Sequence, residues 1–249
     1  MTSGKPRPRA SVESSRDFSE FGAINAWVFD LDNTLYPRST NLHDQVDRRI
    51  RDYVARLLNI GPEDAETLRR DYYQRFGTTL RGLIQEYDVR PDDFLEYVHD
   101  IDHSTVPPDP LLASQIASLP GRKFILTNGS RRHAERVAER LGFTDEFEDI
   151  FDIVRSDLIP KPNRETYDRF VATTGVRPNE AAMFEDLSRN LVVPKALGMK
   201  TILVVPERSG EGLHEDWEVE GRDAAHIDFV TDDLHTFLGE VLAEIGARP

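Results

Sequence analysis

Short apolar runs alternate with helix-like segments in this chain, and the alternation limits the folds that it can adopt. The runs are residues 24–29, 123–126, 181–184 and 201–205. Each has the length and composition of a buried strand. Helical patterns lie between the later runs, at residues 131–140, 164–173 and 187–197, the last interrupted by Pro194. This order predicts an α/β fold with a doubly wound parallel sheet, whose ligand site lies at the carboxyl ends of the strands.

The segment between the first two runs is too long for a simple crossover. A connection between parallel strands needs about a dozen residues or somewhat more, and the stretch from Asp32 to Lys123 is several times that. It has helical periodicities of its own within residues 46–58, 73–87 and 91–98. We therefore expect an inserted helical cap domain that covers the site. The expected boundaries are a disordered N-terminal tail at 1–22, a core at 23–40 and 103–249, and the cap at 41–102.

Two features near the C-terminus complete the expected organisation. Residues 207–222 are polar and contain glycine, which predicts a loop. Residues 232–245 carry leucine, phenylalanine and valine at helical spacing, which predicts a final surface helix.

Charge and composition exclude several classes of protein. The net charge of −14 repels phosphate backbones, so we expect no nucleic-acid polymer as a partner. The chain has no cysteine, which excludes disulfides and thiolate chemistry and fits a reducing compartment. No apolar stretch approaches the ~18–20 residues of a membrane span. The start, MTSGKPRPRASVESSR, lacks the apolar segment of a secretory signal. We expect a cytoplasmic protein without a membrane partner.

The segment FDLDNTLYP, residues 29–37, places two aspartates at the end of the first apolar run. Residues two apart on a strand face the same side, so Asp30 and Asp32 should converge and raise each other's pKa. A hard divalent cation relieves this repulsion, and carboxylate oxygens suit Mg²⁺. A local capping cluster is an alternative. A calcium-binding loop fails, because its glycine and glutamate positions hold Leu35 and Asn41.

Other polar groups follow the later runs. Residues 127–130, TNGS, precede a predicted helix, whose free N–H groups and dipole favour an anion. Lys161 is a loop cation, and the acidic pair Glu185 and Asp186 ends the third run, with Asn190 on the next turn. Each alone has a local explanation, such as a solvated lysine or a helix cap. Together they indicate a site that handles phosphate with a metal ion.

Four motifs in this order resemble those of the haloacid dehalogenase-like hydrolases: Asp30-x-Asp32-x-Thr34, Thr127-Asn128, Lys161-Pro162 and Glu185-Asp186…Asn190. The resemblance spans residues 24–206, about three-quarters of the chain, and implies a Rossmannoid core. The segment YYQRFGTTLRGLIQEYDVRPDDF, with DNTLYP and HAERVAERLG, is similar to the pyrimidine 5′-nucleotidase branch. That branch often has two aspartates where this chain has Glu185-Asp186, which leaves open whether Glu185 binds the metal directly. It commonly has alanine where this chain has Gly129.

The resemblance implies a phosphatase that works through an aspartyl-phosphate. Asp30 would attack phosphorus, splitting one displacement into two. Asp32 would protonate the leaving oxygen and then take a proton from the attacking water. The implied metal is Mg²⁺, held by Asp30, Asp186 and the backbone carbonyl of Asp32, with Glu185 a further candidate. The implied phosphate-binding residues are Thr127, Asn128, Gly129 and Lys161, the last also catalytic, and the candidate specificity residues are Tyr36 and Arg81.

The expected substrate is a small phosphorylated metabolite, in particular a pyrimidine nucleoside 5′-monophosphate. A broad-specificity phosphatase acting on phosphoglycolate or sugar phosphates is an alternative, as are a phosphomutase and a non-catalytic binding module. A haloacid dehalogenase would need neither Mg²⁺ nor the proton-donating Asp32. A binding module would be expected to have lost one of the core motif residues, and none is lost. The sequence leaves the oligomeric state open.

Overall fold

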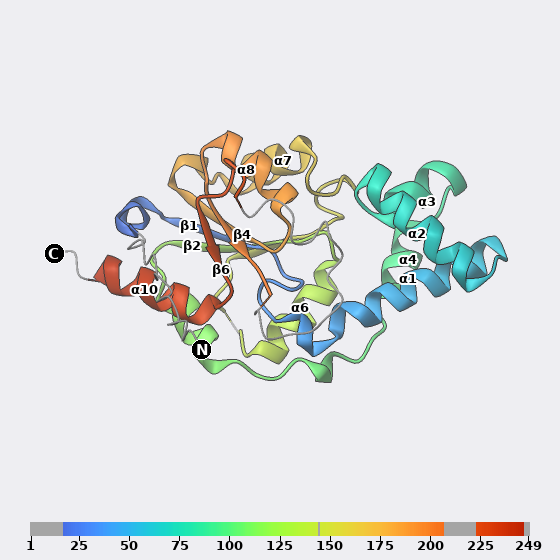
Figure 1. The fold of residues 1–249 in the computed structure, drawn as a ribbon, viewed down its shortest axis with the longest axis horizontal. Coiled ribbons are helices and arrows are strands. Elements are labelled where there is room, and N and C mark those ends of the chain that lie inside the picture. Colours follow the sequence, from blue (N-terminus) through green and yellow to red (C-terminus); the bar gives the residue numbers. More distant parts are fainter. Residues whose placement is uncertain (1–16, 144, 207–222, 247–249) are drawn as a thin grey trace, which may run out of the picture.

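The computed structural model describes residues 17–143, 145–206 and 223–246. Its centre is a six-stranded sheet with the order β3-β2-β1-β4-β5-β6, in which all neighbouring strands are parallel (Figure 1). The strands are β1 (Ala26–Phe29), β2 (Arg122–Leu126), β3 (Asp149–Phe151), β4 (Ala181–Glu185), β5 (Lys200–Val204) and β6 (Phe229–Thr231). The predicted α/β fold with a doubly wound parallel sheet is confirmed.

The two outer strands and one helix differ from the sequence prediction. Strands β3 and β6 have three residues each, too few for a recognisable apolar run, and they were not predicted. The helix predicted at 187–197 is divided into a 3₁₀ turn, Ser188–Leu191, and helix α8, Val192–Leu197. Pro194 lies in the first turn of α8, where its missing N–H is tolerated.

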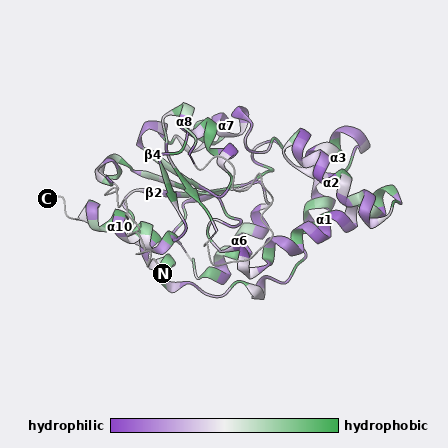
Figure 2. Ribbon diagram, viewed as in Figure 1, coloured by the Kyte–Doolittle hydropathy of each residue, from purple (hydrophilic) through white to green (hydrophobic). Residues whose placement is uncertain are grey.

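Helices cover both faces of the sheet (Figure 1). They are α5 (Pro110–Ser118), α6 (Arg131–Leu141), α7 (Arg164–Thr174), α8 and α10 (Leu234–Gly246). Successive residues of β1 point to opposite faces. Trp27 and Phe29 pack in one hydrophobic cluster with α5, α6 and α10, whereas Ala26 and Val28 pack in another with α7 and α8. Burial on both faces explains why the strands are continuously apolar (Figure 2).

A group of four helices lies between β1 and α5 in the sequence and to one side of the sheet (Figure 1). They are α1 (Leu42–Leu58), α2 (Pro62–Phe76), α3 (Thr79–Tyr87) and α4 (Pro91–Val98). They bury a core of their own, which includes Val54, Tyr72, Leu83 and Phe94. Ile153, which follows β3, joins this cluster. We call α1–α4 the cap; it packs on the sheet domain beyond the carboxyl end of β3.

The folded part of the chain begins at an earlier residue than the sequence predicted. A 3₁₀ helix covers Ser19–Ala23, and Phe21 is fully buried and stacks on Trp27 with ring centroids 5.9 Å apart. The predicted tail at 1–22 therefore extends too far, because this aromatic side chain belongs to the core. Residues 1–16 and the predicted loop at 207–222 lie outside the described residues. The final helix appears as α10, close to its predicted position.

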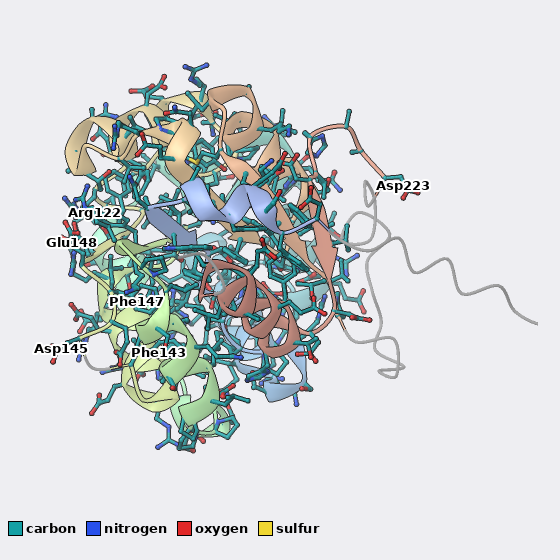
Figure 3. All side chains as sticks on the ribbon, turned by 90° about the vertical axis from the view of Figure 1, so that its left-hand side faces the viewer. Arg122, Phe143, Asp145, Phe147, Glu148 and Asp223 are labelled. Atoms are coloured by element: carbon teal, nitrogen blue, oxygen red, sulfur yellow. The ribbon has the colours of Figure 1, made fainter. Side chains whose placement is uncertain are left out.

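The amino ends of β2 and β3 lie on the side of the sheet domain away from the cap (Figure 3). There the guanidinium of Arg122 donates two hydrogen bonds to Glu148, with Nε–Oε2 2.7 Å and Nη2–Oε1 2.5 Å. The rings of Phe143 and Phe147 pack edge to face beside this pair. Across the described ranges, no helix is both long enough and apolar enough to cross a membrane.

Candidate active site

The site lies where the strand order reverses. β1 pairs with β2 on one side and with β4 on the other, and such a switch point opens a crevice at the carboxyl ends of the strands. Asp30 directly follows β1, and Glu185 ends β4. The backbone N–H of Asp30 donates to the carbonyl of Phe184 at 2.9 Å, which extends the pairing and brings the two acidic side chains together.

Lys161 is buried between these carboxylates. Its Nζ donates to Asp30 Oδ1 at 2.6 Å and to Glu185 Oε1 at 2.7 Å, and only 2% of the residue is exposed. The loop that carries Lys161 is held by Asn128, whose Oδ1 accepts from the Lys161 N–H at 2.8 Å and whose Nδ2 donates to the Lys161 carbonyl at 3.3 Å. The position of Lys161 in a loop did not predict that this lysine would be buried.

The carboxyls of this cluster influence one another. Burial raises the pKa of Asp30 to about 7, because it outweighs the lowering by Lys161 and because Glu185 adds to the rise. Burial and the neighbouring Glu185 and Asp30 likewise raise the pKa of Asp186 well above its usual range. Burial alone would lower the pKa of Lys161, but Asp30 and Glu185 raise it above its usual value. One lysine therefore does not offset the whole acidic cluster.

The donor set fits a hard divalent cation. Asp30, Glu185 and Asp186 each offer a carboxylate oxygen, and these oxygens all lie within 4.8 Å of one another. Glu185 is already engaged by the protein, since Oε1 accepts from Lys161 and from Asn190 Nδ2 at 2.6 Å, and Oε2 from the N–H of Leu187 at 2.7 Å. Oxygen ligands at this density suit Mg²⁺, and the mutual repulsion of the carboxyls gives a cation a favourable place.

The loop after β2 leads into α6. The N–H of Gly129 donates to Thr127 Oγ1 at 2.9 Å, and Ser130 caps the helix by accepting from the N–H of His133 at 3.3 Å. A Cβ on Gly129 would lie 3.2 Å from Thr127 Oγ1 and 3.3 Å from His133 Cδ2. The glycine thus lets this loop approach the site closely.

Asp32 is held through one of its oxygens. Its Oδ1 accepts from the hydroxyl of Tyr36 at 2.5 Å and faces His133 Nε2 at 3.0 Å. Burial would raise the pKa of Asp32, but His133 and Tyr36 hold it below its usual range. Tyr36, a candidate specificity residue from sequence, is 2% exposed with its hydroxyl on this carboxylate. His133 was missed; its one signal was a histidine in the first turn of the helix after the second motif.

Contacts between the cap and the core lie beside the site. The guanidinium of Arg189 lies 4.4 Å above the ring of Tyr73, in α2. At the end of α2, a Cβ on Gly77 would lie 3.0 Å from Pro160 Cγ and 3.4 Å from the Lys161 carbonyl. Arg81 is half-buried in α3, and its side chain has no hydrogen bond or ion pair to the described residues.

The sequence is similar to a known protein family and to characterised proteins. Residues 24–198 match the family of haloacid dehalogenase-like hydrolases. Phosphate metabolism protein 8 of Saccharomyces cerevisiae is 26% identical over 88% of this chain and 71% of its own. A phosphoglycolate phosphatase of Chromobacterium violaceum is 28% identical over 73% of this chain and 85% of its own.

Solved structures share the fold at lower identity. A haloacid dehalogenase-like phosphatase from Thermococcus onnurineus superposes with a TM-score of 0.56 at 18% identity, covering 89% of this chain and 99% of its own. L-2-haloacid dehalogenase from Xanthobacter autotrophicus gives 0.55 at 18% identity, with 91% and 100% coverage. The family match extends over well more than half of the sequence, and the chain belongs to the haloacid dehalogenase-like hydrolases.

Proposed function

We propose that the protein is a Mg²⁺-dependent phosphomonoesterase that acts through an aspartyl-phosphate, with a pyrimidine nucleoside 5′-monophosphate as substrate. The observation that carries the proposal is the different setting of two aspartates two residues apart. Asp30 lies in the charged cluster with Lys161, whereas Asp32 is contacted at Oδ1 by Tyr36 and His133. Paired carboxyls in distinct environments are suited to distinct roles.

The roles follow from these surroundings. Asp30, in the ionised form that Lys161 favours, attacks phosphorus; the bond to the leaving oxygen breaks, and Asp32 gives that oxygen a proton. Water then attacks the phosphorus of the aspartyl-phosphate, Asp32 takes a proton from it, and the bond to Asp30 breaks to release inorganic phosphate. Thr127, the N–H groups of Asn128 and Gly129, and Lys161 bind the phosphoryl oxygens.

Asp30, Asp186 and the carbonyl of Asp32 would hold Mg²⁺, with Glu185 supporting them through Lys161 and Asn190. The cation would neutralise charge on the phosphoryl group. A dehalogenase does not need a second aspartate for proton transfer, and this favours the phosphatase over the dehalogenases that share the fold.

Choice of substrate falls to the cap, because the core groups bind only the phosphoryl group. The turn at Gly77 lies against the Lys161 loop, and Tyr73 lies under Arg189, so α2 and the start of α3 border the place of the leaving group. A closed cap excludes water from the reaction. A pyrimidine ring suits a small covered pocket better than a purine.

A broader phosphatase is the second candidate. It is favoured by the relative named phosphoglycolate phosphatase. Both candidates require the same core chemistry and differ only in what the cap accepts.

The test is release of inorganic phosphate from a panel of esters in the presence of Mg²⁺, alongside chloride release from 2-chloropropionate. The panel holds UMP, CMP, AMP, GMP, phosphoglycolate and glucose 6-phosphate. Preference for UMP and CMP, with no activity in Asp30→Asn, is the expected result. Similar kcat/KM across the panel would favour the broad phosphatase, and chloride release without phosphate release would overturn the proposal.

A further inference from the structure

A chain of hydrogen bonds runs from Asp32 away from the acidic cluster. His133 Nε2 lies 3.0 Å from Asp32 Oδ1, and His133 Nδ1 lies 3.1 Å from His103 Nε2. His103 Nδ1 lies 3.1 Å from the carbonyl oxygen of Ile101. The His133 side chain is 0% exposed, so water does not replace these partners. We call Ile101, His103, His133 and Asp32 the histidine relay.

The two ends of the relay determine where its protons lie. A peptide carbonyl only accepts, so His103 must carry its proton on Nδ1. Burial lowers the pKa of His103, which keeps this ring neutral and leaves Nε2 as an acceptor. His133 must then donate from Nδ1.

His133 thus uses both of its ring nitrogens, Nδ1 toward His103 and Nε2 toward Asp32, and these two contacts fix the orientation of its ring. His99 stacks on His133 with ring centroids 4.5 Å apart, and burial lowers its pKa to about 3, so this neighbour adds no competing charge.

The relay also orients the carboxylate. Tyr36 and His133 both contact Oδ1, while Oδ2 accepts no hydrogen bond within the described part of the chain. Oδ2 lies on the side of Gly129, 3.7 Å from where a Cβ on that residue would be. This is the loop proposed to bind the phosphoryl group. One oxygen is thus anchored, and the other faces the reaction.

We propose that His133, supported by His103 and the Ile101 carbonyl, is a positioning residue that holds Asp32 with Oδ2 toward the leaving oxygen. This inference rests on the proposed phosphatase function. His133 does not touch the substrate; it acts through Asp32. Its role is greatest when the leaving oxygen needs a proton.

The test compares two leaving groups in His133→Leu. p-Nitrophenolate leaves without proton assistance, whereas the alkoxide of UMP or phosphoglycolate does not. A general acid contributes about 10²–10⁴-fold, and we expect loss of its positioning residue to lower kcat/KM for the alkyl ester by about 10–10²-fold. The kcat/KM for p-nitrophenyl phosphate should fall much less. Equal losses on both esters, or no loss, would overturn the inference.

A second variant separates orientation from folding damage. The amide nitrogen of glutamine can occupy the position of Nε2 and donate to Oδ1, so His133→Gln should recover part of the alkyl-ester activity lost in His133→Leu. A glutamine variant no better than leucine would overturn the positioning role. Thermal unfolding of both variants checks that the cap and core remain folded.

The matched control is another histidine–aspartate pair. His235 has Nε2 2.8 Å from Asp109 Oδ2, and it belongs to α10, a helix that lies away from the cap (Figure 1). His235→Leu should leave the ratio of the two kcat/KM values unchanged, and a change as large as that of His133→Leu would overturn the inference. If the wild type cleaves neither ester, the proposed function itself has failed.

Discussion

Lys161 Nζ donates to Asp30 Oδ1 at 2.6 Å across 131 residues of sequence, with 1% of the lysine side chain exposed. The same nitrogen donates to Glu185 Oε1 at 2.7 Å. Lys161 is thus the cation shared by the first and last motifs at the switch point between β1 and β4. The folded state depends on this charge, because the carboxyls around it have been removed from water.

Replacing this lysine should destabilise the protein. In Lys161→Met, Asp30 and Glu185 would remain buried without their cation, and breaking a buried ion pair from one side costs about 3–5 kcal/mol. The free energy of unfolding, measured with urea in metal-free buffer, should fall by about this amount. The control is Lys195→Met, whose pair with Asp228 is partly exposed and should contribute about 1 kcal/mol or less. Equal losses in the two variants would contradict the prediction.

Substitution of Asp30 and of Asp32 should impair the reaction at different steps. Asp30→Asn removes the nucleophile, so no phosphoryl-enzyme should form. Asp32→Asn should lower kcat by roughly 10²–10⁴-fold and let the phosphoryl-enzyme persist, because the water that attacks it lacks a base. Acid quenching and peptide mass spectrometry would locate the phosphate.

Asp168→Asn, which loses only an exposed pair with Arg164 in α7, should behave as the wild type. A covalent phosphate found on a residue other than Asp30 would contradict the assignment of the nucleophile.

The architecture was predictable because strands that are buried on both faces are continuously apolar in sequence. Residues 26–29 of β1 are fully buried, and such strands read as continuous apolar runs. β3 and β6 showed no such run, since three residues do not establish a pattern. Phe21 was assigned to the tail because one aromatic residue in a polar context carries no periodicity.

Residue spacing alone predicted the site only where its chemistry is local, and the grouping of Asp30 with Lys161 and Glu185 followed from the family resemblance. Asp30 and Asp32 are neighbours, so their shared face could be inferred from spacing. The contact between Asp32 and His133 joins residues 101 positions apart, and no local pattern indicates which helix turns a histidine toward the site. The pairing of Arg189 with Tyr73 depends likewise on how the cap sits on the core.

Activity and stability should both depend on a divalent cation. EDTA should abolish phosphate release, and Mg²⁺ should restore it while Ca²⁺ does so poorly, because the larger ion has a looser coordination shell. A ligand that binds only the folded state at 100 times its Kd stabilises it by about 2.7 kcal/mol, so Mg²⁺ should also raise Tm.

This rise should be lost in Asp186→Asn, which removes one oxygen of the cluster, and kept in Asp168→Asn. Full activity after exhaustive chelation, or the same Tm shift in Asp186→Asn, would show that the cluster does not hold the ion.

The last prediction concerns Arg81 and the choice of leaving group. Its guanidinium has no hydrogen bond or ion pair to the described residues, and it lies four residues after Gly77, where the cap meets the Lys161 loop. A planar donor of this kind can bind a base carbonyl or stack on a ring. If it does so, Arg81→Ala should lower kcat/KM for UMP far more than for p-nitrophenyl phosphate, which offers no base to recognise.

The wild type should also prefer pyrimidine nucleotides. A polar group left unpaired in a covered pocket is costly, so kcat/KM should be higher for UMP and CMP than for AMP and GMP. Arg90→Ala is the control, because the side chain of this cap arginine is 81% exposed. This variant should change kcat/KM neither for UMP nor for p-nitrophenyl phosphate. Equal losses on UMP and p-nitrophenyl phosphate in Arg81→Ala would remove Arg81 from substrate recognition, and a wild type without pyrimidine preference would favour the broad phosphatase.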